Sequence, residues 1–146
     1  MSVSIIDKID LKTPEKKKNT YIIDTNIFVN EPNIISKIGS HNRIIIPAKV
    51  LEELDKLKLN GKVDNHIINK AARNINQAFS NNRSQMEEAD VSLLPASFDK
   101  KNPDCMILSV ALKFKNENPI LLASDNILQT RAQGLGIRAI SLKDLK

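Results

Sequence analysis

Short apolar runs alternate with helix-like patterns along most of this chain. Five runs have the length and residue types of β-strands, and they cover residues 21–24, 43–46, 91–94, 120–123 and 137–140. Helical spacing is predicted near residues 31–38, 48–58, 64–80, 103–115 and 125–133. Strands separated by helices of this length pair in parallel through right-handed crossovers. The pattern therefore predicts an α/β fold, a three-layer α/β/α sandwich around a central parallel sheet.

The runs at 21–23, 44–46 and 120–123 are apolar throughout, as strands buried on both faces should be. Residues 81–90 are polar and fit a helix or a loop equally well. Residues 1–19 are also polar and end in a basic run, which predicts a flexible N-terminal arm before a folded domain at 20–146. A basic tail that touches RNA is the alternative interpretation of the arm.

Four acidic residues lie where such a fold builds an active site. Asp24 ends the first apolar run and Asp125 follows the run at 120–123, while Asp104 and Glu53 belong to predicted helices. Open α/β sheets bind ligands at the carboxyl ends of their strands. Carboxylates gathered there would repel one another unless cations lay between them. The simplest interpretation is a divalent metal site.

Each of the three aspartates taken alone is better explained as part of a helix start. Asp24 and Asp125 each follow a strand, in the position of an N-cap residue. Asp104 comes after Asn102 and Pro103, which suit the N-cap and the first helical position, and an early aspartate complements the helix dipole. Capping alone would leave no function to name.

Helical phase favours a shared site. At about 100° per residue, Glu53 falls on the edge of the apolar stripe of its helix, whereas Glu52 lies nearly opposite the centre of that stripe. Asp104 falls in line with Ile107 and Leu108, inside the stripe of its own helix. An ionised carboxylate directed inward is costly unless a cation or helix-end amides compensate it. One metal pocket is therefore the better account of the four acids together.

A site made of carboxylates suits Mg²⁺ or Mn²⁺ rather than zinc, which prefers nitrogen and sulfur. His41 and His66 lack the spacing of zinc ligands. Cys105 is the single cysteine, which excludes an internal disulfide, and it falls on the packed side of its helix. The sequence has no Ser/His/Asp or Cys/His pattern typical of a nucleophilic enzyme.

Composition adds a little to this picture. A chain of 146 residues with 41% apolar and 27% charged residues suits one folded domain. A net charge of +5 is weak support for a phosphate-bearing partner. The N-terminus has no signal-like pattern and no apolar run reaches transmembrane length, so we expect a cytoplasmic protein with no membrane partner.

The segments that carry the acids resemble the PIN domain family, a nuclease-like fold found in bacterial toxins and in eukaryotic RNA-decay proteins. The matching segments are YIIDTNIF, IIIPAKVLEELDKLK, NPDCMILSVAL and ILLASDNILQTRAQGLGI. Each is short, but their order and spacing make the combination specific. The run from EPNIISKI to NKAARNINQAF is most similar to the PIN module at the N-terminus of PhoH-like ATPases.

The resemblance implies a set of catalytic, metal-binding acids, namely Asp24, Glu53, Asp104 and Asp125. It also implies supporting polar positions beside them, which are Thr25, Asn26, Ser124 and Asn126. In many members a further acid or asparagine follows the last aspartate by two residues, and here that place is Ile127. This departure bears on how well a second metal is held, although Asn126 could substitute in part.

The predicted function is a metal-dependent endoribonuclease that cuts single-stranded RNA and leaves a 5′ phosphate and a 3′ hydroxyl. Candidate residues for holding the RNA backbone are Lys49, Lys56, Arg73 and Arg131. Because only 3% of the residues are aromatic, we expect little recognition by base stacking. The resemblance also implies that homodimers form.

The rival prediction is a catalytically weak PIN-fold module that binds RNA or assembles with a fused or partner ATPase. Ile127 favours this module, and the presence of all four acids opposes it. A phosphoacceptor domain would need an adjacent acidic pair at the first strand, where Ile23 precedes Asp24. A dinucleotide-binding domain would need GxGxxG there. The chain also lacks GxxxxGK[ST], so a PhoH-like ATPase would lie beyond residue 146.

Overall fold

The computed structural model describes residues 17–145, so most of the polar arm predicted at 1–19 lies outside the described residues. Within this range, five strands form one parallel sheet in the order β4-β3-β2-β5-β6. The strands are β2 (Thr20–Ile23), β3 (Arg43–Pro47), β4 (Ser84–Glu87), β5 (Pro119–Leu122) and β6 (Arg138–Ile140). The parallel sheet expected from the sequence is confirmed.

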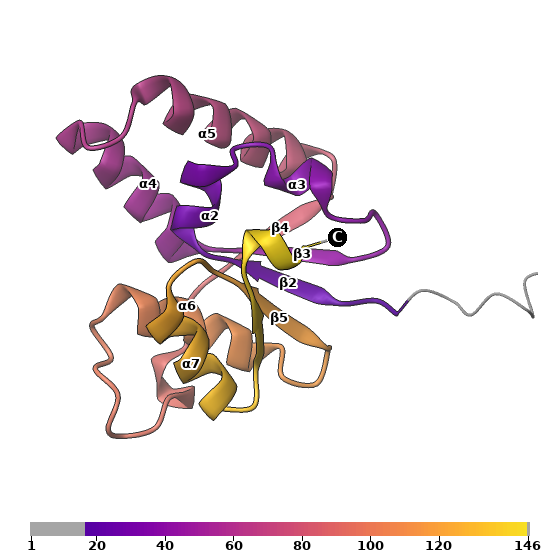
Figure 1. Cartoon of the computed structure of the whole chain (residues 1–146), viewed down its shortest axis with the longest axis vertical. Helices are drawn as coiled ribbons and strands as arrows, with labels where there is room; N and C mark the ends of the chain where they lie inside the picture. The colour runs from indigo at the N-terminus through magenta and orange to yellow at the C-terminus, as the bar shows by residue number, and fades with distance from the viewer. Residues whose placement is uncertain (1–16, 146) are drawn as a thin grey trace, which may run out of the picture.

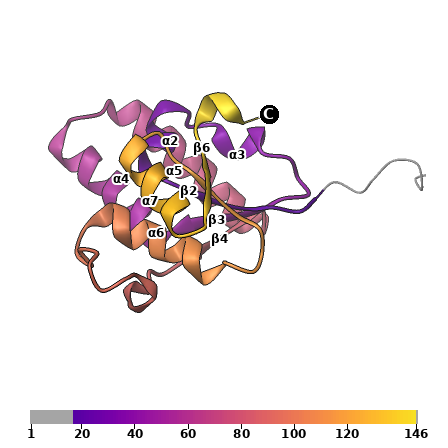
Figure 2. The ribbon, with the colours of Figure 1, turned by 60° about the horizontal axis from the view of Figure 1, so that its bottom comes forward.

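Helices cover both faces of the sheet (Figure 1). One layer contains α2 (Thr25–Asn30), α3 (Ile34–Lys37), α4 (Ala48–Asn60) and α5 (Asn65–Ser80). The other contains α6 (Pro103–Lys113) and α7 (Asn126–Gly134), which Figure 2 brings forward. Two short 3₁₀ helices, η2 (Val91–Leu93) and η3 (Leu142–Asp144), complete the described chain. The architecture is the predicted α/β/α sandwich.

The core lies where the central strands meet the two helical layers. Every residue of β2 is buried, and so is every residue of β3 after Arg43. On α5 the buried side chains recur at helical spacing and are Ile68, Ala71, Ile75 and Ala78. Burial of apolar surface on both faces of the sheet therefore fixes the position of the strand ends that carry the acids.

The strand predicted at 91–94 is wrong. Residues Val91–Leu93 form η2, because the side chain of Asp90 accepts a hydrogen bond from the backbone N–H of Ser92 and so starts a tight turn. The fifth strand is instead β4, inside the segment 81–90 that was expected to be a helix or a loop. β4 lies at the edge of the sheet and only Ser84 is buried in it, so it carries no apolar signal.

The single helix predicted at 31–38 is also wrong. Within 31–38 the structure has one shorter helix, α3, while α2 ends at Asn30, before this range, and Pro32 lies between the two. Proline has no N–H to donate and keeps the residue before it out of the helical conformation, and Glu31 accordingly has φ −145° and ψ 82°. The other predicted helices and strands are confirmed within two residues at each end.

The order of the strands defines one special edge. From the central strand β2 the chain proceeds to β3 and β4 on one side, and then returns to build β5 and β6 on the other. The chain therefore adds strands on one side of β2 as far as β4 and on the other side from β5 onward, so the strand order reverses between the neighbours β2 and β5. In open α/β sheets the crevice beyond the carboxyl ends of two such strands is where ligands bind. None of the helices among residues 17–145 combines the length and the apolar character needed to cross a membrane.

Candidate active site

Asp24 lies at the carboxyl end of β2, directly at the reversal of winding. It is 3% exposed, and its side chain accepts no capping hydrogen bond from α2 although it occupies the N-cap position. The pKa of Asp24 is raised from 3.8 to about 7; burial is the largest cause, the charges of Asp104 and Glu53 also raise it, and the backbone amides of Thr25 and Asn26 partly offset the rise. Helix capping alone therefore does not explain why an aspartate is buried at this position.

Glu53 projects from α4 toward the same edge. The hydroxyl of Thr25 donates a hydrogen bond of 2.6 Å to its Oε1. The neighbouring Glu52 points to the surface, where it pairs with Lys49 at 3.0 Å and with Lys56 at 3.3 Å. The separation of the two glutamates expected from helical phase is confirmed, and Thr25 holds Glu53 in one orientation.

Asp104 sits in the first turn of α6 without capping it. The cap is Asn102, whose side-chain oxygen accepts hydrogen bonds from the backbone N–H groups of Asp104 at 2.8 Å and Cys105 at 3.2 Å. Asp104 is half-buried, and its pKa is raised by burial and by the charge of Asp125, while Arg131 lowers it. Its carboxylate is free for chemistry because Asn102 already satisfies the helix start.

Helix capping explains the position of Asp125. Its Oδ1 accepts hydrogen bonds from the N–H groups of Ile127 at 2.7 Å and Leu128 at 3.1 Å, so it is the N-cap of α7. The neighbouring Ser124 and Asn126 are exposed, and Ile127 is 67% exposed at the place of the missing acid. One oxygen of Asp125 is therefore committed to the helix.

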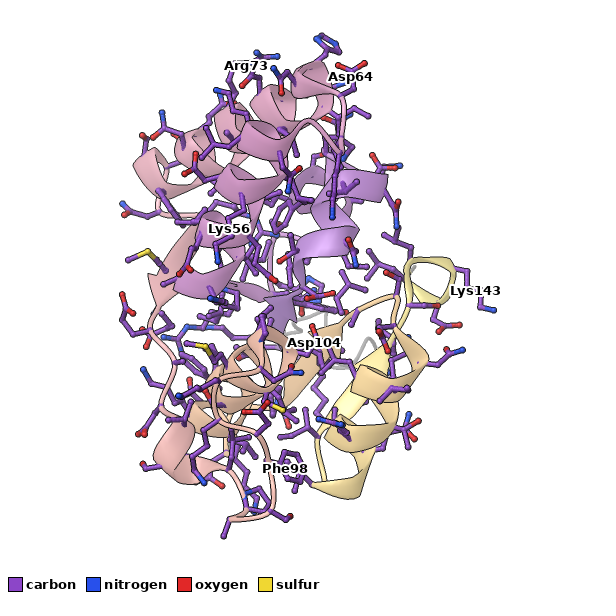
Figure 3. All side chains as sticks on the ribbon, turned by 90° about the vertical axis from the view of Figure 1, so that its left-hand side faces the viewer. Lys56, Asp64, Arg73, Phe98, Asp104 and Lys143 are labelled. Atoms are coloured by element: carbon purple, nitrogen blue, oxygen red, sulfur yellow. The ribbon has the colours of Figure 1, made fainter. Side chains whose placement is uncertain are left out.

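A cavity of about 200 Å³ joins these elements. Its lining comes from α2, α4, α6 and the end of β2, and comprises Asp24, Thr25, Asn26, Glu53, Lys56, Leu57 and Asp104. Figure 3 shows Lys56 on the α4 side and Asp104 on the α6 side. Asp125 is not part of this lining, yet it lies near enough to Asp104 to raise its pKa. The structure therefore brings three of the predicted acids together and places the fourth beside them.

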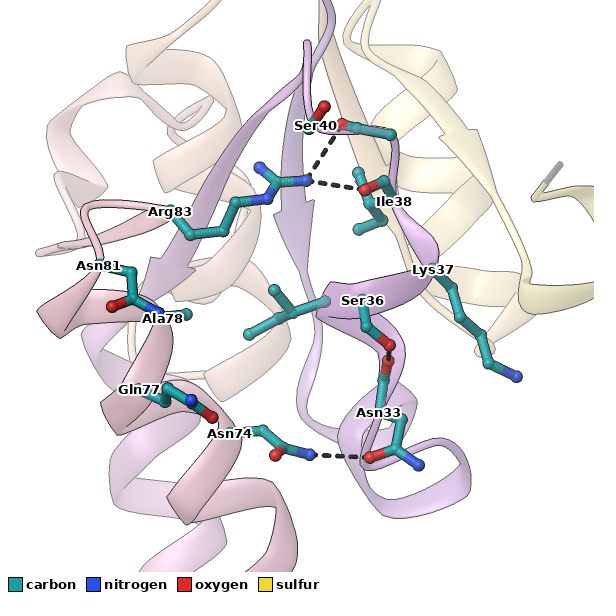
Figure 4. Close-up of a pocket in the computed structure, with 12 residues that line it drawn as sticks. Asn33, Ser36, Lys37, Ile38, Ser40, Asn74, Gln77, Ala78, Asn81 and Arg83 are labelled. Atoms are coloured by element: carbon teal, nitrogen blue, oxygen red, sulfur yellow. Dashed lines mark hydrogen bonds between the residues drawn. The ribbon is translucent and has the colours of Figure 1, made fainter.

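A larger cavity, of about 440 Å³, lies between α3 and α5 (Figure 4). Both charged groups that line it are already committed. Lys37 pairs with Glu31 at 2.9 Å, and the guanidinium of Arg83 donates hydrogen bonds to the backbone oxygens of Ile38, Gly39 and Asn42 at 2.8, 3.0 and 2.9 Å. These residues precede β3 and β4, so the cavity lies at the amino ends of the strands. Among the described residues that line it none is acidic. Arg83 ties the segment before β4 to the segment before β3, so the role of this cavity is structural rather than catalytic.

The chemistry of the acid cluster suits a hard divalent cation. Its donors are carboxylate, hydroxyl and amide oxygens. Neighbouring carboxylate charges raise the pKa of Asp24 and of Asp104, a repulsion that a cation would relieve. Across residues 17–145, however, no three His, Cys, Asp or Glu side chains are already grouped so as to hold a metal ion. Glu53 and Asp125 each have one oxygen engaged by another partner, which leaves the second oxygen of each for a cation.

The sequence indicated Lys49, Lys56, Arg73 and Arg131 as basic candidates, and the structure separates them. Lys56 lines the cavity of the acid cluster, and the charge of Arg131 lowers the pKa of Asp104. Lys49 pairs with Glu52, as Lys56 does, but is not part of the cavity lining, and Figure 3 shows Arg73 far from Asp104. The role of Arg131 depends on the packing of α7 against α6, which no pattern within either helix reveals.

Comparisons with known proteins agree with this geometry. The chain is similar to the protein named PhoH2 of Mycolicibacterium smegmatis, with 24% identity over 86% of this chain and 32% of that protein. It is also similar to PhoH2 of Bacillus subtilis, with 24% identity over 82% and 32%. The transcriptional protein SWT1 of Saccharomyces cerevisiae is 29% identical over 95% and 35%. The chain thus spans about a third of the length of the curated relatives it matches.

Solved structures share the fold. A domain of a functionally unknown protein from Methanocaldococcus jannaschii superposes with a TM-score of 0.59 and 26% identity, covering 88% of this chain and 94% of that one. A PilT N-terminus domain protein from Sulfolobus solfataricus gives 0.53 and 15%, covering 86% and 89%. The sequence profile of the PIN domain, a family whose members are generally nucleases using divalent metal ions, matches residues 21–143. This chain therefore belongs to the PIN domain family.

Proposed function

We propose that this domain is a metal-dependent endoribonuclease that hydrolyses phosphodiester bonds of single-stranded RNA. The observation that carries the proposal is the convergence of Asp24, Glu53 and Asp104 on one cavity, although they come from the end of β2, from α4 and from α6. The cavity lies at the reversal of strand winding, where α/β sheets bind ligands. Membership of the PIN domain family supports a nuclease.

Asp24, Glu53, Asp104 and the second oxygen of Asp125 would hold Mg²⁺ or Mn²⁺. When bound, such a cation stabilises negative charge on the scissile phosphate and lowers the pKa of a bound water. Asp24 would give up a proton on binding the cation, because its pKa of about 7 leaves it partly protonated near neutral pH.

Polar side chains around the acids would act as supports. Thr25 fixes Glu53 through its 2.6 Å hydrogen bond, and Asn26 lines the same cavity. Ser124 and Asn126 flank Asp125 on the exposed rim, where they could orient the RNA. Lys56 adds a positive charge to the cavity wall, which favours entry of a phosphate group.

A second candidate function rests on Ile127 and on the lack of a grouped set of ligands within residues 17–145. In this alternative the domain binds RNA with weak or absent cleavage and works as a module of a longer protein that contains a PhoH-like ATPase. The limited share of the PhoH2 relatives that the chain spans is compatible with such a context. Homodimer formation and a cytoplasmic location stay predictions under either function.

A cleavage assay separates the two functions. Fluorescently labelled single-stranded RNA is incubated with the domain in Mn²⁺, in Mg²⁺ or in EDTA, and the products are resolved on a gel. We expect cleavage with a divalent cation only. Asp104→Asn should lower cleavage by at least about 10- to 100-fold, because it removes one carboxylate of the site, and it should still fold because Asn102 caps α6. Asp55→Asn, an exposed residue of α4, is the matched control and should cleave normally.

Two results would contradict the nuclease. Cleavage that persists in EDTA would exclude the metal mechanism. RNA binding without cleavage in either cation would favour the module attached to an ATPase.

A further inference from the structure

A third cavity, also of about 440 Å³, lies beside the segment that leads into α6, the helix that carries Asp104. It is lined by Ser97, Phe98, Asp99, Asn102 and Arg131. Asn102 is the residue whose side chain holds the backbone N–H of Asp104 at 2.8 Å. Arg131 reaches the same place, because it contacts Cys105, the residue that follows Asp104 in α6. A molecule seated in this cavity would therefore lie next to a residue of the candidate active site.

Phe98 gives this cavity an aromatic wall. The chain has one tyrosine and four phenylalanines, and all of them fall within the described residues. Tyr21, Phe28 and Phe114 are buried in the core, and Phe79 lines a separate groove between α4 and α5. Among these five rings, Phe98 is the one that faces a cavity beside the acids. Partly exposed rings at such places stack nucleic acid bases.

Arg131 extends this wall. Its guanidinium carbon lies 5.7 Å from the centre of the Phe98 ring, and its Nη1 donates a hydrogen bond of 3.2 Å to the sulfur of Cys105. Two contacts thus hold a planar cation against a planar ring. Unpaired bases stack on aromatic rings and on guanidinium planes alike.

The charges of the cavity favour a base over a phosphate. Arg131 contributes one positive charge and Asp99 one negative charge, so the formal charges of the lining cancel. Asn102 uses its oxygen for the helix cap and offers its amide nitrogen, and Ser97 offers a hydroxyl. Oδ1 of Asp99 accepts from the N–H of Lys101 at 3.0 Å, which leaves its second oxygen to accept from an exocyclic amine. These groups complement the edge of a nucleobase.

We propose that this cavity binds the base of an unpaired nucleotide adjacent to the bond that is cleaved, with the base stacked on Phe98 and Arg131. The proposal rests on the proposed function, because it treats the neighbouring acids as the cleavage site. It gives the domain one stacking subsite, although its aromatic content is only 3%.

Titration of the ¹⁵N-labelled domain in EDTA tests this binding without any cleavage. The probes are adenosine 5′-monophosphate, cytidine 5′-monophosphate and ribose 5-phosphate, which carries the phosphate but no base. We expect the two nucleotides to shift the NMR signals of Phe98, Asn102 and the Arg131 side chain, and ribose 5-phosphate to leave them unchanged. Equal shifts from ribose 5-phosphate, or no shift from any probe, would overturn the proposal.

Variants of the ring give a second measurement. Phe98→Leu should weaken binding of a labelled single-stranded RNA in EDTA by about tenfold, the loss expected for one stacked base. Phe98→Tyr should restore binding, and the matched control Phe79→Leu should bind like the parent. Thermal unfolding of each variant identifies a folding defect. If Phe98→Leu binds RNA as tightly as Phe79→Leu does, the subsite does not exist, whatever the cleavage assay shows.

Discussion

Replacing Asp24 by asparagine removes the most deeply buried carboxylate of the cluster while keeping the shape of the side chain. The pKa of Asp24 is about 7 in the folded protein, against 3.8 for an exposed aspartate. At 1.36 kcal/mol per pKa unit, this difference corresponds to about 4 kcal/mol of folding free energy. The neutral amide is no longer repelled by the charges of Asp104 and Glu53, so asparagine suits the site.

The direction in which stability changes with pH follows from proton binding. Because the folded pKa lies above the unfolded one, the folded protein holds the Asp24 proton more tightly. Its contribution to stability is present below pH 3.8 and is lost as the pH rises through about 7. In EDTA, the free energy of unfolding of Asp24→Asn should therefore match that of the parent near pH 4 and exceed it by about 4 kcal/mol at pH 8.

Urea denaturation in EDTA at a series of pH values between 4 and 8 measures this difference. Asp55→Asn carries the same charge change on an exposed residue of α4 and should follow the parent at every pH. Adding Mn²⁺ at pH 8 should stabilise the parent and not Asp24→Asn. A difference between Asp24→Asn and the parent that does not change with pH would refute the reasoning.

Three further variants test single contacts. Asp125→Ala should cost about 1 kcal/mol because α7 loses its cap, whereas Asp125→Asn should keep the cap and lose RNA cleavage alone, as thermal unfolding and the cleavage assay would show. Thr25→Val should reduce cleavage about 10- to 100-fold because Glu53 loses its 2.6 Å donor, with Thr25→Ser restoring it. Ser84→Ala should leave stability unchanged or raise it by up to about 1 kcal/mol in urea denaturation, because the buried Ser84 hydroxyl has no hydrogen-bond partner among residues 17–145.

Much of the fold was predictable because buried parallel strands carry a strong local signal. The apolar runs now seen as β2, β3 and β5 are buried on both faces, and α5 shows its buried stripe in the sequence. β4 was missed because it is an edge strand held by pairing with β3 rather than by apolar side chains. Pairing of this kind depends on residues far away in the chain.

The candidate site was predictable in part because helical periodicity is also a local signal. Helical phase was enough to predict that Glu53 points toward the site and Glu52 toward solvent. The cavity beside Asp104 was missed, since it depends on α7 packing against α6 and on the placement of Phe98 in a connection without regular structure. The protonation of Asp24 was missed too, because the extent of burial at a strand end is set by the layers on both sides.

Anomalous diffraction from crystals soaked in Mn²⁺ tests the central claim most directly. A shared carboxylate site predicts manganese within ligand distance, about 2.0–2.3 Å, of oxygens from Asp24 and Asp104, with Glu53 or Asp125 completing the shell. The same soak of Asp104→Asn crystals should show weaker density at this place or none. Absence of manganese among the four acids in the parent crystals would contradict the metal-dependent nuclease.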